Sequence, residues 1–512
     1  MGQDSGGMRR RQFIGVVGAS SALGALAVSA SKANAAKVSR AGSRNRSVLP
    51  VGVPIRVKPV LVYQLPKRGE KTSWRGYGGL QTESAVNEEV KRIEGELKNL
   101  SSHAEFPLEF LPLVLVNNEQ QAEEVSAGDC DGILVYASAG PDSWYSIIAA
   151  SGIPNVMFLR HKSGPYYLYH EIAHWRFLRK SGDTIEEPNM DVDDIVVDDY
   201  DEVLWRLRAL YGLKNAKGTK MLAIGSLAAY SKPAQDLGPT HAKEVWDYEI
   251  EILPSEKFAQ RLQEARGDGK LMKEIERETD ELLGQPNVTL ETERRFVVNS
   301  LSAWKVCKEF LNETGATNFG FDRCMGKSVI EMLDTPPCLI LALANDEGYT
   351  AYCHTDLSHT LPGVLMRWIA GKPTFVCNTH FPHNGMMTVA HCAAPMRMNG
   401  RDYGRTKIMT HFESDYGAAT KVDHPKGQVL TVVVPNLHCT KWQGFRGKVI
   451  DSPSHPACRT QIDIEIDGDS RKLLTDMEGF HAQIVYGDYL NEIGYALKTL
   501  GGVGWENFSV VV

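Results

Sequence analysis

The chain has 512 residues, of which 43% are hydrophobic and 23% are charged. This length is too great for one hydrophobic core, and the composition is that of a soluble globular protein, so two or three domains are expected. The net charge of −7, without a long basic run, argues against a nucleic-acid partner.

The first 36 residues have the features of an export signal. Paired arginines in Arg9–Arg11 precede Phe13 and Ile14, and a stretch of small and apolar residues follows. Ala33-Asn34-Ala35 then suits a signal peptidase. This order resembles a twin-arginine signal, so we expect a periplasmic or secreted protein that keeps no membrane span after the signal is removed. Residues 37–54 are basic and contain Ser and Pro, which predicts a flexible lead-in.

Strands and helices alternate from residue 55 to residue 238. This alternation predicts an N-terminal α/β domain with a doubly wound sheet. Strands are expected at Val57–Tyr63, Gly132–Tyr136, Asn155–Leu159 and Lys220–Gly225. Helices are expected at Ser84–Leu100, Tyr166–Lys180 and Asp199–Leu213, with another ending at Ile147–Ser151.

A second α/β domain is predicted for residues 239–395, and a β-rich C-terminal domain for residues 396–512. In the second domain we expect strands at Val245–Ile252, Cys338–Leu343 and Thr374–Cys377, and helices at Ser255–Leu283, Leu290–Leu311 and His359–Ala370. In the third we expect strands at Val429–Val434, Gln461–Ile466 and Gln483–Tyr486, separated by turn residues, and a closing helix at Tyr489–Leu500.

The string His170-Glu171-x-x-His174 has the spacing of a zinc protease motif. On a helix this spacing puts two imidazoles one turn apart beside a general base. The longer zinc-binding pattern is absent, because Phe177 and Lys180 stand where it needs Gly and His. Glu202 is the one downstream candidate for a third ligand, and nothing beside it strengthens that role. An ordinary helix is therefore the favoured interpretation, and a zinc metalloprotease is kept as an alternative.

The nine cysteines are spread out and form no C-x-x-C pair. A protein that folds before export keeps most cysteines as buried thiols, and one disulfide could form afterwards.

Histidines and acids gather in the second half of the chain. Ten of the 15 histidines lie between residues 354 and 481, several of them at predicted strand ends. The strings concerned include His354-Thr355-Asp356, His391-Cys392, His411-Phe412-Glu413 and Phe480-His481. Carboxylates and imidazoles at the strand ends of an α/β fold build divalent-metal sites. Mixed oxygen and nitrogen ligands favour Mn²⁺ over a thiolate-bound zinc.

Several strings resemble the L-fucose isomerase and L-arabinose isomerase-like family, in particular an exported branch of it. They occur in order over residues 72–489 and include "TSWRGYGG", "NDEGYTAYCHTDLSHTL", "AHCAAPMRMNG", "THFESDYGAA", "PACRTQIDIEIDG" and "GFHAQIVYGDY". The resemblance implies a subunit with two α/β layers and a β-rich C-terminal domain, assembled as a trimer or hexamer. It also implies Mn²⁺ bound to the sugar's O1 and O2, with a carboxylate that moves a proton between C1 and C2 through an enediol.

The resemblance also implies roles for single residues. Asp356 matches a metal-binding aspartate, His481 matches the C-terminal histidine ligand, and His391 is a further candidate ligand. Relatives have glutamate where this chain has His354, and Asp322 is the candidate for the glutamate that shuttles the proton. Substrate contacts are expected from Trp74, Arg75, His411 and Glu413.

The leading hypothesis is thus a metal-dependent protein of the aldose–ketose isomerase type that acts on a sugar or a sugar-derived molecule. Because His354 replaces a carboxylate, a non-catalytic exported carbohydrate-binding relative is the first alternative. The metalloprotease is the second.

Overall fold

The computed structural model describes residues 51–167, 175–178, 182–323 and 326–509. The chain divides into two units, residues 1–46 and 47–512, and every described residue belongs to the second unit. The predicted signal, most of the lead-in and the HExxH motif lie outside the described residues. Within the described ranges, no helix is both long enough and apolar enough to cross a membrane.

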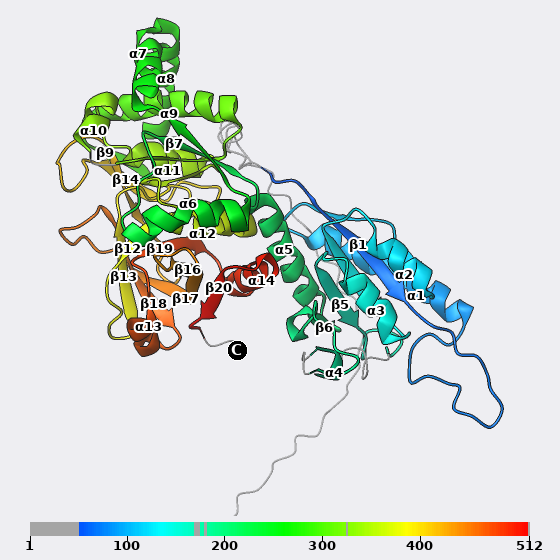
Figure 1. Cartoon of the computed structure of the whole chain (residues 1–512). Helices are drawn as coiled ribbons and strands as arrows, with labels where there is room; N and C mark the ends of the chain where they lie inside the picture. Colours follow the sequence, from blue (N-terminus) through cyan, green and yellow to red (C-terminus); the bar gives the residue numbers. More distant parts are fainter. Residues whose placement is uncertain (1–50, 168–174, 179–181, 324–325, 510–512) are drawn as a thin grey trace, which may run out of the picture. The chain divides into compact units, whose positions relative to one another are not determined.

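The first sheet is parallel and has the order β2-β1-β4-β5-β6, with β3 also paired to β1. Strands β4 and β5 are buried at every position, as expected for parallel strands with both faces covered. The strands are β1 (Ile55–Val62), β2 (Leu108–Phe110), β3 (Val114–Val116), β4 (Gly132–Ala137), β5 (Asn155–Leu159) and β6 (Ile195–Val197). The helices of this region are α1 (Glu83–His103), α2 (Glu119–Ser126), α3 (Asp142–Ala149), α4 (Trp175–Leu178) and α5 (Tyr200–Ala216) (Figure 1).

The second sheet is also parallel, with the order β11-β10-β7-β8. Its strands are β7 (Lys220–Ile224), β8 (Glu249–Leu253), β10 (Asn318–Phe321) and β11 (Thr350–Cys353). Its helices are α6 (Lys232–Trp246), α7 (Ser255–Gly267), α8 (Gly269–Leu283), α9 (Arg294–Thr314), α10 (Lys327–Leu333), α11 (Cys338–Asp346) and α12 (Leu357–Ala370). The expected mixture of parallel α/β sheets is therefore confirmed. The predicted boundary at residues 238/239 falls inside α6, and β7, which precedes it, pairs with strands that follow it.

Four predicted elements of this region differ from the structure. The helix expected at 290–311 begins only at Arg294, because residues 290 and 291 belong to strand β9 (Val288–Glu291). Residues 338–343 are not a strand but the first part of helix α11, because periodicity cannot separate a short, fully buried helix from a buried strand. Residues 245–252 are only partly a strand, since α6 continues to Trp246 and β8 begins at Glu249. The long helix expected at 255–283 is two helices, because Asp268 caps the start of α8 by accepting hydrogen bonds from the backbone of Lys270 and Leu271.

The C-terminal region is an antiparallel β-barrel, which confirms the β-rich prediction. Strands follow the order β16-β19-β12-β13-β18-β17, and pairing between β16 and β17 closes the ring. The barrel strands are β12 (Phe375–Thr379), β13 (Met386–His391), β16 (Val429–Pro435), β17 (Lys441–Asp451), β18 (Thr460–Asp467) and β19 (His481–Tyr486). Around it lie α13 (Ser470–Asp476), α14 (Leu490–Leu500), β20 (Gly504–Asn507), and a small sheet of β9 (Val288–Glu291), β14 (Arg405–Met409) and β15 (Ala419–Asp423). Strands β12 and β13 thus belong to the barrel, although the sequence places them before residue 396.

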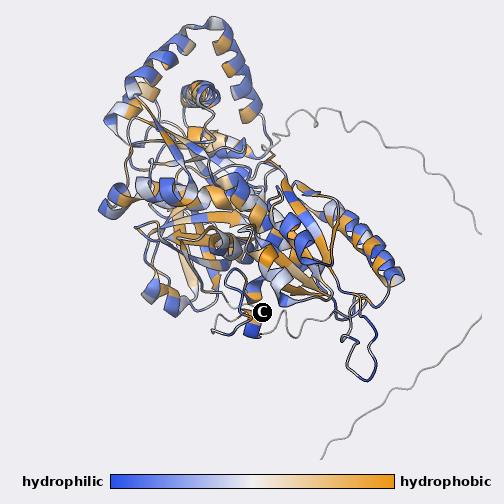
Figure 2. Cartoon of the chain, turned by 45° about the vertical axis from the view of Figure 1, so that its right-hand side comes forward, coloured by the Kyte–Doolittle hydropathy of each residue, from blue (hydrophilic) through white to orange (hydrophobic). Residues whose placement is uncertain are grey.

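Helix α12 connects the second sheet to the barrel. Almost all of its residues are buried, and it contacts β11 on one side and β16 and β19 on the other. Figure 2 shows hydrophobic residues gathered on the strands and on the helix faces that meet them, whereas the α7–α8 hairpin is largely hydrophilic. Side chains at the start of α12 therefore lie where the parallel sheet meets the barrel.

Candidate metal centre

The carboxyl ends of three parallel strands form one wall of the candidate site. In the register of the second sheet, Phe321 at the end of β10 lies between Ile224 of β7 and Cys353 of β11. The residues that follow these ends are Gly225 and Ser226, Asp322, and His354 to Asp356. The carboxyl edge of a parallel sheet is where α/β folds bind ligands, so three chain segments present polar groups at such an edge.

Two glycines make room at this edge. A Cβ on Gly225, whose φ is +99°, would lie 2.6 Å from the Asp322 carboxyl carbon. A Cβ on Gly320 would lie 2.6 Å from the His354 carbonyl oxygen. His354 itself has a φ of +66°, a left-handed conformation that costs free energy for a residue other than glycine. The absence of a side chain on Gly320 lets His354 take this conformation against the neighbouring strand.

Backbone hydrogen bonds fix the Asp356 carboxylate. Asp356 caps α12, and its Oδ1 accepts a hydrogen bond of 2.9 Å from the backbone N–H of Ser358. Its Oδ2 accepts another of 3.1 Å from the backbone N–H of Tyr230. Each carboxylate oxygen keeps a further lone pair, so the group is held in place and can still bind a cation.

The barrel supplies the opposite wall. Strand β12 lies between β19 and β13, and Asn378 pairs with His481 on one side and with Ala390 on the other. His481 at the start of β19 and His391 at the end of β13 therefore reach the same end of the barrel. Both histidines are buried.

Asp356, His359 and His481 form a buried group of potential metal ligands. One ligand atom from each residue lies within 4.8 Å of the ligand atoms of the other two. The His359 Nε2 contacts the Cys353 carbonyl oxygen at 3.1 Å, and because that oxygen can only accept, Nε2 carries the proton. The buried Nδ1 then has a lone pair, and it has no hydrogen-bond partner among the described residues. A backbone carbonyl that orients the second ring nitrogen is the usual support for a metal-binding histidine.

Burial keeps these imidazoles neutral. It lowers the pKa of His359 to about 3, with the nearby His354 and His391 adding to the shift. Burial also lowers the pKa of His481 well below its ordinary value, and His359 and His391 act in the same direction. A neutral imidazole is the form that binds a metal. One carboxylate and two such nitrogens fit Mn²⁺, Fe²⁺, Co²⁺ or Zn²⁺.

No protein-family profile matches the chain, and no curated protein matches it. The assignment of this centre therefore depends on its geometry. Two of its members, Asp356 and His481, are among the three ligands expected from the sequence. The third member, His359, was not predicted. A signal was present, because Asp356-x-x-His359 at the start of a helix puts both side chains on the same face.

His391 and His354 lie near this group without belonging to it, and His411 lies near His391. Burial lowers the pKa of His391 to about 4, with the neighbouring His354 and His411 adding to the shift. The Nδ1 atoms of His391 and His411 are buried and have no hydrogen-bond partner within the described ranges. The His354 ring lies 4.2 Å from the Tyr230 ring, which lies 4.8 Å from the His481 ring. Several imidazoles thus lie close to one another around the ligand group.

The other predicted site residues lie outside the ligand group. Asp322 accepts a hydrogen bond of 3.0 Å from the Ser226 hydroxyl at the same sheet edge. Glu413 is exposed. Trp74 and Arg75 lie in the loop between β1 and α1, where the Arg75 guanidinium stands 5.0 Å from the Trp74 ring centre.

An open cavity of about 650 Å³ lies next to Phe480, whose ring contacts the ligand His481. It is lined by Thr379, His380, Phe381, His383, Met477, Glu478, Gly479 and Phe480. The Phe480 ring lies 4.2 Å from the His481 ring and 5.9 Å from the Tyr230 ring. Phe381 is 79% exposed. The cavity therefore offers apolar ring faces and polar groups beside the ligand group.

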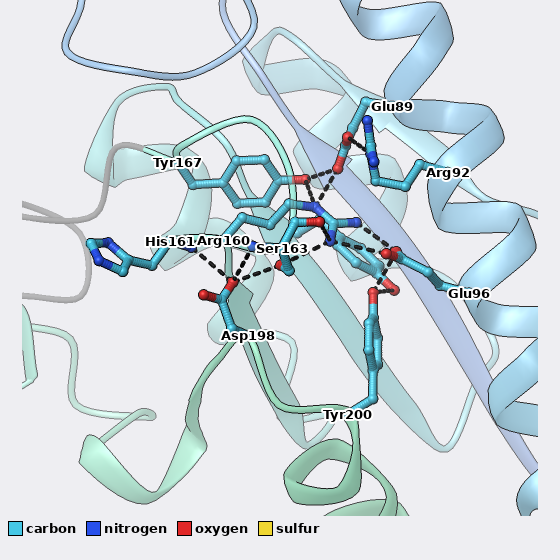
Figure 3. A network of polar contacts seen from close by, with 10 residues as sticks. Glu89, Arg92, Glu96, Arg160, His161, Ser163, Tyr167, Asp198 and Tyr200 are labelled. Atoms are coloured by element: carbon cyan, nitrogen blue, oxygen red, sulfur yellow. Dashed lines mark hydrogen bonds and ion pairs between the residues drawn. The ribbon is translucent and has the colours of Figure 1, made fainter. Parts of the chain in front are cut away.

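A second polar cluster lies in the first sheet, and its side chains bond to one another and not to an open site (Figure 3). Arg160, directly after β5, is fully buried and donates to the carboxylates of Glu89 and Glu96 on α1. Tyr167 donates to Glu89, and Tyr200 donates to Glu96. These groups satisfy one another, so the cluster joins α1 to the sheet and we assign it no ligand.

Proposed function

We propose that the chain binds a divalent metal, most readily Mn²⁺, through Asp356, His359 and His481. We further propose that it acts on a sugar or a sugar-derived molecule by proton transfer next to a carbonyl, as in aldose–ketose isomerisation. The observation that carries the proposal is the buried group of one carboxylate and two neutral imidazoles beside an open cavity. Convergent polar groups near a cavity are typical of a ligand site.

The metal, when bound, supplies positive charge that polarises the sugar carbonyl and stabilises an enediolate. The residues of the chain hold the metal ligands in position. The backbone N–H groups of Ser358 and Tyr230 hold the Asp356 carboxylate, and the Cys353 carbonyl orients His359. Preorganised ligands of this kind reduce the rearrangement that binding would otherwise require.

The adjoining cavity suits a carbohydrate. Phe480 lines it next to His481, and the apolar face of a sugar ring packs against such a ring. His380, His383 and Glu478 supply groups that can bond hydroxyls. We propose that a sugar in this cavity reaches the metal ligands past Phe480, whose ring contacts His481.

Proton transfer requires an acid–base group within hydrogen-bond reach of the substrate carbons. We assign this role to His354 and Asp322, which follow β11 and β10 at the same sheet edge. His354 is held next to Tyr230, and Asp322 is held by Ser226. The membership of the isomerase-like family, the export and the homo-oligomeric assembly remain predictions of the sequence.

The first experiment is elemental analysis of the purified protein and five variants. We expect about one divalent metal per chain, lost in Asp356→Ala, His359→Ala and His481→Ala. It should be kept in His103→Ala, which changes an exposed histidine at the end of α1. Zinc that disappears with His170→Ala instead would support the protease and contradict this assignment.

The second experiment measures turnover. Aldoses are incubated with the metal-loaded protein in deuterated water, and deuterium at C1 or C2 is followed by NMR. Exchange that is lost in His354→Ala or Asp322→Asn supports isomerase-type chemistry. Metal and sugar binding without any exchange would instead favour the non-catalytic carbohydrate-binding protein.

A further inference from the structure

Cys392 and Cys458 lie beside each other at one end of the barrel. Strands β13 and β18 are antiparallel, and their pairing ends with His391 opposite Thr460. Cys392 comes directly after the first strand, and Cys458 lies two residues before Thr460. The backbone N–H of Arg459 donates to the Cys392 Sγ at 3.3 Å, which brings the Cys458 main chain to that sulfur. The two thiols also share a hydrogen bond.

The surroundings of the pair differ from those of a thiol in the hydrophobic core. The Cys458 thiol, then the backbone N–H groups of Arg459 and Phe412, donate to the Cys392 sulfur and lower its pKa despite burial. For Cys307, by contrast, burial raises the pKa well above the ordinary value. Cys458 is only partly buried, so it is the member of the pair that a small molecule can reach. The same hydrogen bond, together with burial, raises the pKa of Cys458, so Cys392 is the more acidic thiol and Cys458 becomes a thiolate by passing its proton to Cys392.

We propose that Cys392 and Cys458 form a disulfide when the folded protein meets a small disulfide oxidant. The Cys458 thiolate attacks one sulfur of the oxidant, forms a mixed disulfide and releases one thiolate of the oxidant. The Cys392 thiolate then attacks the Cys458 sulfur, which closes the Cys392–Cys458 bond and releases the second thiolate. The two cysteine protons pass to the released thiolates, and the oxidant is reduced by two electrons.

The bond would tie together two segments next to the metal centre. Cys392 follows His391, and Arg459 anchors the other segment by donating from Nε to the Thr410 carbonyl at 2.7 Å and from Nη2 to the Thr410 hydroxyl at 3.0 Å. His411 comes next in the chain. The bond would also close a loop of 65 residues, 393–457. Cross-links over long loops restrict the unfolded chain most, so oxidation should raise the thermal midpoint by a few degrees.

The test uses the reduced full-length protein treated with oxidised glutathione. Free thiols are counted under denaturing conditions, and linked peptides are mapped by mass spectrometry. We expect two fewer thiols and one linked peptide pair that joins Cys392 to Cys458. An unchanged thiol count, or a link from Cys458 to another cysteine, would overturn the proposal.

Two variants test which cysteines form the bond. Cys377→Ser removes a fully buried thiol of β12 that also lies near Cys458, and the Cys392–Cys458 link should still form. In Cys392→Ser, Cys458 should keep the bound glutathione, because no thiol remains to displace it. If either variant folds poorly, the peptide map of the unaltered protein decides by itself. The result is independent of metal binding and sugar turnover.

Discussion

The Arg160 cluster gives a prediction whose magnitude can be worked out from the structure. Arg160 has no exposed side-chain surface, and its partner Glu89 is 1% exposed. Arg160→Met would keep a side chain packed among the surrounding aromatic rings. It would leave the Glu89 carboxylate buried without its main counter-charge. Breaking a buried ion pair in this way costs roughly 3–5 kcal/mol. Glu89 would retain Tyr167 and the half-exposed Arg92, so we expect the lower end, about 3 kcal/mol.

The assay is urea unfolding of a double-mutant cycle. Arg160→Met combined with Glu89→Gln removes both charges, so the pair of changes should cost at least about 1 kcal/mol less than the sum of the two single changes. Arg56→Met in β1 is the matched control. Its partner Asp129 is 93% exposed, and its loss should cost far less, because solvent-exposed ion pairs contribute little to stability. A cost for Arg160→Met no larger than that of the control, or strict additivity in the cycle, would refute the reasoning.

Three further predictions concern other parts of the chain. Burial raises the pKa of Glu492 from 4.5 to about 7, so the native state holds its proton more tightly and stability should fall as the pH rises between these values. Glu492→Gln should remove this fall and be up to about 3 kcal/mol more stable above pH 7, measured by urea unfolding at several pH values; equal pH profiles would contradict this. Gly320→Ala should cost roughly 1–3 kcal/mol, because its Cβ would meet the His354 carbonyl at 2.6 Å, and an unchanged unfolding midpoint would disprove the contact. Manganese at about a hundred times its Kd should stabilise the protein by about 2.7 kcal/mol, seen as a rise in thermal midpoint that His359→Ala abolishes and His103→Ala retains.

The sequence by itself determined most of the local structure. The buried strands β4 and β5 are almost uninterrupted apolar runs, and α5 and α14 lie within a few residues of the ranges predicted for them. Residues 338–343, which were predicted as a strand and form a helix, show the limit of prediction from periodicity. An all-apolar segment of that length carries no periodicity, so only its packing against β11 and α9 decides that it is a helix.

The resemblance indicated Asp356 and His481 as ligands, but the spacing along the chain does not show that their side chains meet. They are 125 positions apart, one at the end of a parallel sheet and the other at the start of a barrel strand. His359 belongs with them because α12 turns its first residues toward the barrel, where β12 holds His481 and His391 on either side. Spacing along a chain fixes which side chains share a helix face or a strand edge. Which of those faces meet is decided by long-range packing of the sheet, α12 and the barrel, and only the tertiary structure contains that packing.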